Sequence, residues 1–335
     1  MHYIQKYLDN LPMSKTVMNG KVVSNGKTNI FLYCHYYSFY SQKILMALYE
    51  KNIDFEPIMV DITKGEQYLS WFLDLNPRGE IPVLKAKNEI IPDSIRILDY
   101  LELYLDPGKF PNLFIFHLHN IKCSPFLIEA LPAGVITMGS FFHPQFVGSP
   151  KLPFILPIRE LLKTSHLNAL NLDYANNLRK IAEENPKAKS ILMYKADLQE
   201  RKHEIYSNET EYSKILNIVD QVLGQIEEQL KTQNEGNWLC CESFTVADIN
   251  LAMLLQRLWE LGFENRFWAG GKRPLLQQYY ERVKCRESFK KTIPSFAFHV
   301  KTIIMSQPPA YIGAAGAASF AVVVAFVYLL KKVIH

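Results

Sequence analysis

The sequence predicts a mixed α/β domain, then an all-helical domain, and a single membrane-spanning helix near the C-terminus. Strand-like and helix-like patterns alternate over 30–106, helical patterns alone continue over 107–300, and residues 310–330 carry no charged side chain. At 335 residues the chain is long enough for two domains of ordinary size. Residues 1–29 lack the apolar run of a signal peptide and are expected to be a flexible polar extension.

Composition excludes several classes of function. The 37 basic and 33 acidic residues are spread along the chain, so no basic block dense enough for a nucleic-acid surface is present. Five cysteines without a CxxC spacing, and without a secretory signal, indicate reduced thiols in the cytosol. The nine histidines form no HExxH pattern, so we expect no metal site.

The α/β domain begins with an apolar strand at 30–34 and a helix at 41–51. A second strand is expected at 55–60, and a helix at 68–75 ends at the Asn-Pro-Arg-Gly sequence that starts at Asn76.

Two short strands at 82–86 and 89–91, joined at Lys87-Asn88, then predict a hairpin. A further helix begins at Ser94. The order β-α-β-α-β-β-α is the thioredoxin arrangement. Four apolar residues are expected on one side of that last helix: Ile95, Leu98, Leu101 and Leu105.

Residues 310–330 form one uncharged apolar run just after Pro308 and Pro309. At about 1.5 Å per residue, a helix over this run is roughly 30 Å long, which matches the hydrocarbon core of a bilayer. Five residues follow the run, two of them lysines. A span in this position predicts a tail anchor that leaves the body in the cytosol.

In the helical half, Thr245 and Asp248 stand at the N-cap and N3 positions of a predicted helix. This pair is a variant of the capping box, in which the two residues satisfy each other's amide groups. We assign both to folding and not to catalysis.

Four motifs resemble those of glutathione transferases. Residues 38–44 (Ser-Phe-Tyr-Ser-Gln-Lys-Ile) resemble the N-terminal motif of members with a serine-type site, and residues 80–84 (Glu-Ile-Pro-Val-Leu) resemble their cis-proline strand. Residues 92–101 resemble the start of their next helix, and 244–248 the capping signature of their second half. The resemblance implies a thioredoxin-like N-terminal domain and an all-α glutathione-transferase C-terminal domain.

A closer resemblance covers nearly the whole chain. With the apolar run at 310–330, four segments are similar to the ganglioside-induced differentiation-associated protein 1 family: 71–76, 131–144, 182–186 and 257–283. That family implies a tail-anchored protein of the mitochondrial outer membrane, also found on peroxisomes, that influences organelle fission and redox balance. The resemblance does not by itself establish catalysis.

The resemblance assigns the candidate catalytic group to Ser38, in the turn after the first strand. A helix N-terminus favours an anion, and a serine there can donate a hydrogen bond to the sulfur of glutathione and so lower its pKa. The other interpretation is a plain N-cap. Tyr36 and Ser41 are alternative catalytic hydroxyls, and the sequence does not decide which of Tyr36, Tyr37 and Tyr40 faces the ligand.

Four further residues are implied in glutathione binding. Pro82 is expected to be cis, so that the backbone of Ile81 meets the cysteinyl part of the ligand. The γ-glutamyl group would be bound at Asp93 and Ser94, the hydroxyl and helix N-terminus taking its carboxylate and the aspartate its ammonium. A capping serine preceded by an acidic residue is the alternative.

A helical insert of about 70 residues, 140–210, separates the two halves of the helical domain. It begins with a proline-rich stretch and continues with helical patterns at 173–184 and 189–204. A segment of this length is usually functional or mobile. Either it gates a substrate or docks a partner at the mouth of the ligand cleft, or it is a solvated helical extension.

The leading hypothesis is a membrane-tethered glutathione S-transferase-like protein that acts through binding and organelle remodelling, with weak or no transferase activity. The alternatives are an active transferase that conjugates hydrophobic electrophiles at the membrane surface, and a metaxin-like import or adaptor subunit. We expect no permanently bound cofactor, and glutathione or an apolar small molecule as ligand. Expected partners are the bilayer and a second copy of the chain, at the mitochondrial outer membrane or the peroxisomal membrane.

Overall fold

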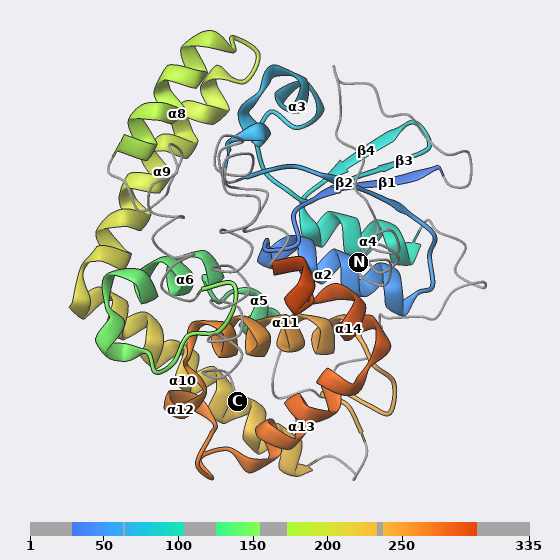
Figure 1. Ribbon diagram of the computed structural model, residues 1–335, viewed down its shortest axis with the longest axis vertical. Coiled ribbons are helices and arrows are strands. Elements are labelled where there is room, and N and C mark those ends of the chain that lie inside the picture. The colour runs from blue at the N-terminus through green and yellow to red at the C-terminus, as the bar shows by residue number, and fades with distance from the viewer. Residues whose placement is uncertain (1–28, 63, 104–124, 155–172, 233–236, 300–335) are drawn as a thin grey trace, which may run out of the picture.

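The computed structural model describes residues 29–62, 64–103, 125–154, 173–232 and 237–299 (Figure 1). Within these ranges no helix combines the length and the apolar character that crossing a membrane requires. The expected span at 310–330, the extension at 1–28 and Leu105 lie outside the described residues.

A four-stranded sheet forms the centre of the N-terminal domain. Its strands are β1 (Ile30–Cys34), β2 (Glu56–Met59), β3 (Val83–Ala86) and β4 (Glu89–Pro92), in the order β2-β1-β3-β4. β1 is parallel to β2, whereas β3 is antiparallel to both β1 and β4. The predicted thioredoxin arrangement is therefore confirmed.

Helices cover both faces of this sheet. One face, with Leu32 of β1, shares a core with α2 (Phe39–Glu50) and α4 (Ser94–Leu103), whereas Tyr33 of the same strand points to α3 (Ser70–Leu75) on the other face. This division follows from the alternation of side chains along a strand.

Two local predictions in this domain need correction: the start of one helix and the side of another on which Ile95 lies. The helix expected from residue 68 is a 3₁₀ turn, η1 (Glu66–Tyr68), followed by α3, because Leu69 between them has extended backbone angles. Ile95 is 50% exposed and not on the buried side of α4, since Ile97 and Leu101, one turn apart, face the core instead.

The second domain is helical. Its centre is α11 (Val246–Leu261), which is buried along almost its whole length, including several polar side chains. It packs against α2 of the first domain, so the two domains share one core. The remaining elements are α5 (Pro125–Glu129), α6 (Ala133–Phe142), η2 (Pro144–Phe146), α10 (Glu209–Thr232), α12 (Glu264–Phe267), α13 (Pro274–Cys285) and α14 (Glu287–Thr292).

The insert between α6 and α10 contains a helical pair, α8 (Asp173–Glu184) and α9 (Lys189–Ser207). Apolar residues of this pair, such as Leu178 and Leu192, form a small core of their own together with Tyr68 and Leu73 of the N-terminal domain. In Figure 1 the pair runs along one side of the molecule, from α3 to α6. The described part of the insert is therefore packed on the body.

Candidate functional site

The residues predicted to bind a ligand meet at one edge of the sheet. Because β1 and β4 both run antiparallel to β3, the carboxyl ends of β1 and β4 lie beside the amino end of β3. Ser38 follows β1, the Ile81–Pro82 peptide precedes β3, and Asp93 and Ser94 follow β4. Sheet topology therefore brings together three segments that are far apart in the chain.

Ser38 is the N-cap of α2. Its backbone is extended, and its Oγ accepts a hydrogen bond from the N–H of Ser41 at 3.2 Å. The capping interpretation is therefore confirmed. A hydroxyl that accepts this bond keeps its own O–H for donation, so a role toward a thiolate stays a prediction.

The two alternative hydroxyls point into the body of the protein. The phenol of Tyr36 is buried beside Cys34 and Tyr49, and its oxygen has no hydrogen-bond partner among the described residues. Burial raises its pKa. Ser41 is fully buried, and its Oγ accepts from the N–H of His35 at 3.4 Å.

Tyr40 is the tyrosine that lies among the acidic groups of the site. It is 42% exposed. The burial of the rest of its phenol, and then the carboxylates of Glu129 and Glu80, raise its pKa. Asp93 acts in the same direction. Sequence reasoning named Tyr40 without placing it, because three tyrosines stand within five positions of one another.

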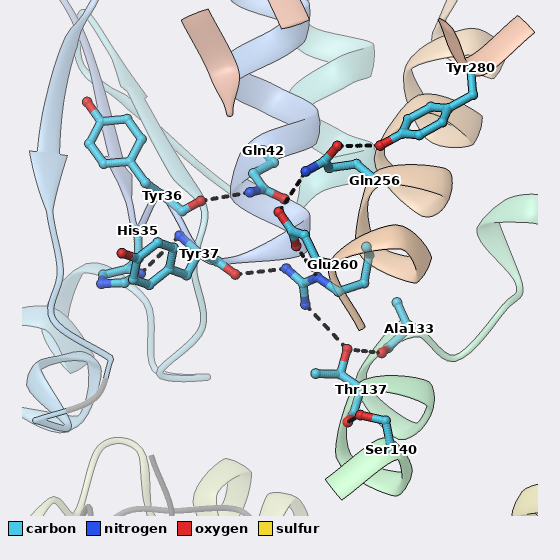
Figure 2. A network of polar contacts seen from close by, with 11 residues as sticks. His35, Tyr36, Tyr37, Gln42, Ala133, Thr137, Ser140, Gln256, Glu260 and Tyr280 are labelled. Carbon is cyan, nitrogen blue, oxygen red and sulfur yellow. Dashed lines mark hydrogen bonds and ion pairs between the residues drawn. The ribbon is translucent and has the colours of Figure 1, made fainter. Parts of the chain in front are cut away.

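The loop that carries Ser38 is held both by α2 and by the helical domain (Figure 2). Gln42 donates from Nε2 to the carbonyl of Tyr36, and Arg257 of α11 donates from Nη2 to the carbonyl of Tyr37, each at 2.9 Å. Arg257 is 6% exposed and forms an ion pair with Glu260, which is 2% exposed. Burial raises the pKa of Glu260, and the neighbouring guanidinium opposes that rise. A buried charge pair thus fixes the position of the loop.

A second contact to the same loop comes from the end of the described chain. The Tyr37 hydroxyl lies 2.8 Å from Nδ1 of His299, and the two rings are stacked. Phe298 packs edge-on against Tyr36, with ring centroids 5.0 Å apart. Burial lowers the pKa of His299 to about 4, so its imidazole is neutral at pH 7.

The Ile81–Pro82 peptide is cis, as predicted. The loop before it is ordered by Asn76, whose Nδ2 donates to the carbonyl of Glu80 at 2.7 Å. Gly79 has a φ of +57°, and a Cβ there would lie 2.6 Å from the ring of Tyr68. Among the described residues, the amide and carbonyl of Ile81 have no hydrogen-bond partner.

Asp93, and not Ser94, caps α4. The Asp93 carboxylate accepts from the N–H groups of Ile95 and Arg96, at 2.9 and 3.4 Å, and its φ is +78°. Ser94 is the first residue of α4, is 7% exposed, and its hydroxyl has no partner in the part of the chain that the structure describes. The alternative of a capping serine was therefore wrong, and the hydroxyl remains available for a ligand.

Lys43 is a residue of this region that sequence reasoning did not single out. Its Nζ forms an ion pair with Glu129 of α5 at 2.7 Å, and Lys43 is only 2% exposed. Burial lowers its pKa, while Glu129 and then Asp93 favour its charged form. A lysine within an apolar helical stretch is the only sequence signal that would have indicated it.

Helix α9 also reaches the site. Lys195 donates from Nζ to the carbonyls of Arg78 and Gly79, at 2.9 and 3.2 Å, and lies 3.3 Å from the carboxylate of Glu80. Its ammonium lies 5.2 Å from the ring centroid of Tyr68. The insert is therefore fastened to the loop that ends in the cis peptide.

Thr245 and Asp248 lie away from this edge and form the predicted capping box at the start of α11. The carboxylate of Asp248 is fully buried and accepts from the N–H and Oγ of Thr245, the N–H of Leu239 and the hydroxyl of Tyr279. Their assignment to folding is consistent with these contacts.

Across the described ranges, no group of three histidine, cysteine, aspartate or glutamate side chains is placed to hold a metal ion. The four described cysteines, Cys34, Cys240, Cys241 and Cys285, form no disulfide with one another. Burial raises the pKa of Cys34, the one nearest the loop, to about 12, so it is an unreactive thiol at pH 7.

Comparison with known proteins agrees with this geometry. Residues 37–103 match the glutathione S-transferase N-terminal domain, and residues 209–282 match the glutathione S-transferase C-terminal domain. The segment between the two matches, 104–208, contains nearly all of the insert. The chain is 29% identical to human ganglioside-induced differentiation-associated protein 1-like 1, over 92% of this chain and 88% of that protein.

Two solved structures show the same fold. The glutathione transferase URE2P5 from Phanerochaete chrysosporium aligns with a TM-score of 0.54 and 17% identity, over 84% of this chain and 99% of that one. The β-etherase LigF from Sphingobium sp. strain SYK-6 aligns with a TM-score of 0.51 and 22% identity, over 79% of this chain and 98% of that one.

Proposed function

We propose that the chain binds glutathione at the sheet edge beside Ser38, because it is similar to the two glutathione S-transferase domains and to ganglioside-induced differentiation-associated protein 1-like 1. One observation carries the proposal. At that edge, the main chain of Ile81 and the hydroxyl of Ser94 have no hydrogen-bond partner among the described residues, although both lie next to ordered loops. Glutathione is a peptide with the amide and carboxylate groups needed to satisfy them.

We further propose that the protein binds glutathione but has weak or no transferase activity. Ser38 Oγ already accepts the capping bond of α2, and the hydroxyls of Tyr36 and Ser41 are buried. Of these three hydroxyl groups, that of Ser38 alone can still donate a hydrogen bond to a thiolate. Similarity to a family does not by itself establish catalysis.

We also propose that the protein is tethered at the mitochondrial outer membrane and at peroxisomes, where it influences fission and redox balance. The uncharged run at 310–330 supports this tether because its length matches a bilayer core. The similarity to the ganglioside-induced differentiation-associated protein family supports the choice of membrane.

Calorimetry of the full chain in detergent, titrated with glutathione, tests the proposed site. We expect weak binding and slow conjugation of an aryl halide. Ser94→Ala removes the available hydroxyl and should weaken binding further, whereas Ser70→Ala, an exposed serine on α3, should not. Absence of any glutathione binding would refute the site.

A fluorescent fusion at the N-terminus tests the tether. The full chain is expected on mitochondria, and the chain cut after Gln307 in the cytosol. If the shortened chain stays on the organelle, residues 310–330 are not the anchor.

An active transferase is the second candidate, and it is favoured by the free O–H of Ser38. It predicts fast conjugation that Ser38→Ala abolishes and Ser41→Ala reduces little. Fast conjugation that survives Ser38→Ala would exclude the serine mechanism.

A further inference from the structure

Helix α9 presents a second lysine next to the candidate glutathione site. Lys202 follows Lys195 by seven residues, which is close to two helical turns, so both lie on the same side of α9 about 10 Å apart. Lys195 is bound to the loop before Ile81. Lys202 therefore lies on the same side of α9, about two turns beyond the point where Lys195 contacts that loop.

The next turn of α9 places Lys202 between the two domains. Tyr206, four residues further on, packs against Phe142 of α6, with ring centroids 5.4 Å apart, and its carbonyl lies 3.1 Å from Nε2 of His143. The side of α9 that carries both lysines thus contacts the N-terminal domain at one end and the helical domain at the other. Lys202 lies in the interval between these contacts.

Lys202 has no ion-pair partner in the part of the chain that the structure describes, although it is partly buried. Other charged residues of the insert are paired: Lys189 with Glu183, and Asp197 and Glu200 with Arg179. Burial lowers the pKa of Lys202, and the charge of Glu80 opposes that shift.

The charges around this loop are unbalanced. The single carboxylate of Glu80 is shared by two cations, Arg78 at 3.0 Å and Lys195 at 3.3 Å, and Lys202 on the same side of α9 as Lys195 has no carboxylate partner among the described residues. At the other end of the site, Asp93 is acidic. Glutathione has a matching polarity, since its γ-glutamyl end carries the only ammonium and its glycyl end carries only a carboxylate.

We propose that Lys202 of the insert binds the glycyl carboxylate of glutathione, with Lys195 holding the adjacent loop in place. This inference rests on the proposed glutathione site and adds a ligand-binding residue from outside both segments that match glutathione S-transferase domains. The carboxylate would pair with an ammonium that partial burial shields from water, which strengthens such a contact.

Two ligands and three proteins test the inference. Calorimetry compares glutathione with glutathione monoethyl ester, in which the glycyl carboxylate is esterified, on the full chain in detergent. The wild type, Lys202→Met and the control Lys187→Met are compared. Lys187 lies in the same insert and pairs with Asp74 of the N-terminal domain, but it is 89% exposed and contacts no residue of the loop.

We expect the wild type and Lys187→Met to bind glutathione about tenfold more tightly than the ester. In Lys202→Met the two ligands should bind alike. The ratio within one preparation does not depend on the fraction of protein that is folded, so partial unfolding of a variant does not change the reading.

A preference for glutathione that survives in Lys202→Met would overturn the inference, as would a wild type that binds both ligands equally. In either case the glutathione site itself stands. If no protein binds either ligand, the proposed function fails together with the inference.

Discussion

Removal of Arg257 should expose how strongly the buried charge pair supports the protein. Arg257→Met keeps most of the apolar stem but leaves the Glu260 carboxylate buried, with Gln256 at 2.9 Å as its one remaining side-chain donor among the described residues. The carbonyl of Tyr37 also loses its donor. Breaking a buried pair by removing one partner costs about 3–5 kcal/mol. We expect the lower figure, about 3 kcal/mol of unfolding free energy at pH 7.5, because Glu260 can take up a proton.

The sign of the pH effect follows from Glu260. Burial raises its pKa in the folded state, and Arg257→Met removes the group that opposes the rise. Between the unfolded pKa and the folded one, the folded state binds the extra proton, so the stability of the variant increases as the pH falls through that window. The double variant Arg257→Met/Glu260→Gln lacks this proton and serves as the matched control.

Urea denaturation at pH 7.5 and pH 5.5 measures both effects. At pH 7.5 the double variant should recover about 2 of the 3 kcal/mol, the remainder being the lost hydrogen bond to Tyr37. At pH 5.5 the single and double variants should differ less. If the double variant is as unstable as the single one at pH 7.5, the uncompensated carboxylate is not the cause.

Three further predictions concern single positions. Gly139→Ala should lower the free energy of unfolding, measured by urea denaturation, by about 1–3 kcal/mol, because the new Cβ would clash with the buried ring of Tyr212. Gly134→Ala in the same helix places its Cβ where nothing lies within 4 Å and should raise the free energy of unfolding by up to about 1 kcal/mol. Equal effects would contradict the steric argument. Asp248→Asn should lower the free energy of unfolding by about 3 kcal/mol, since an amide has one acceptor oxygen in place of the two that accept four hydrogen bonds in the carboxylate. A loss below about 1 kcal/mol would refute this explanation. Because the folded pKa of His299 is about 4, stability should fall as the pH drops from about 6.5 toward 4, and His299→Phe should flatten that fall, as urea midpoints between pH 7 and 5 would show.

Local patterns were enough to predict most of the elements. The alternation of apolar residues indicated the strands, and helical spacing with caps indicated α2, α4 and α11. The Thr245–Asp248 capping box was also predicted, because it depends on residues within a few positions of one another. The cis peptide before Val83 was predicted from the resemblance to glutathione transferases and not from a local pattern. Ile95 was misplaced because the first turn of a helix has too few neighbours to define its buried side.

The candidate site was only partly predictable. Its three segments were named from short motifs, but which hydroxyl is buried was not. Tyr36 and Tyr40 are four residues apart and chemically alike, and only the packing of the loop turns one inward and leaves the other among carboxylates. Asp93 took over the cap expected of Ser94 because a left-handed backbone at Asp93 aims its carboxylate at the helix amides.

The sequence by itself determined the fold class, the order of the elements and the apolar run at 310–330, since these depend on periodicity and on hydropathy along the chain. Tertiary structure alone decided what holds the site. Arg257 reaches the loop of Tyr37 from 220 positions away, and Lys195 reaches Gly79 from 116. No local pattern records such pairs, because a polar side chain at a helix surface finds its partner only when the domains pack.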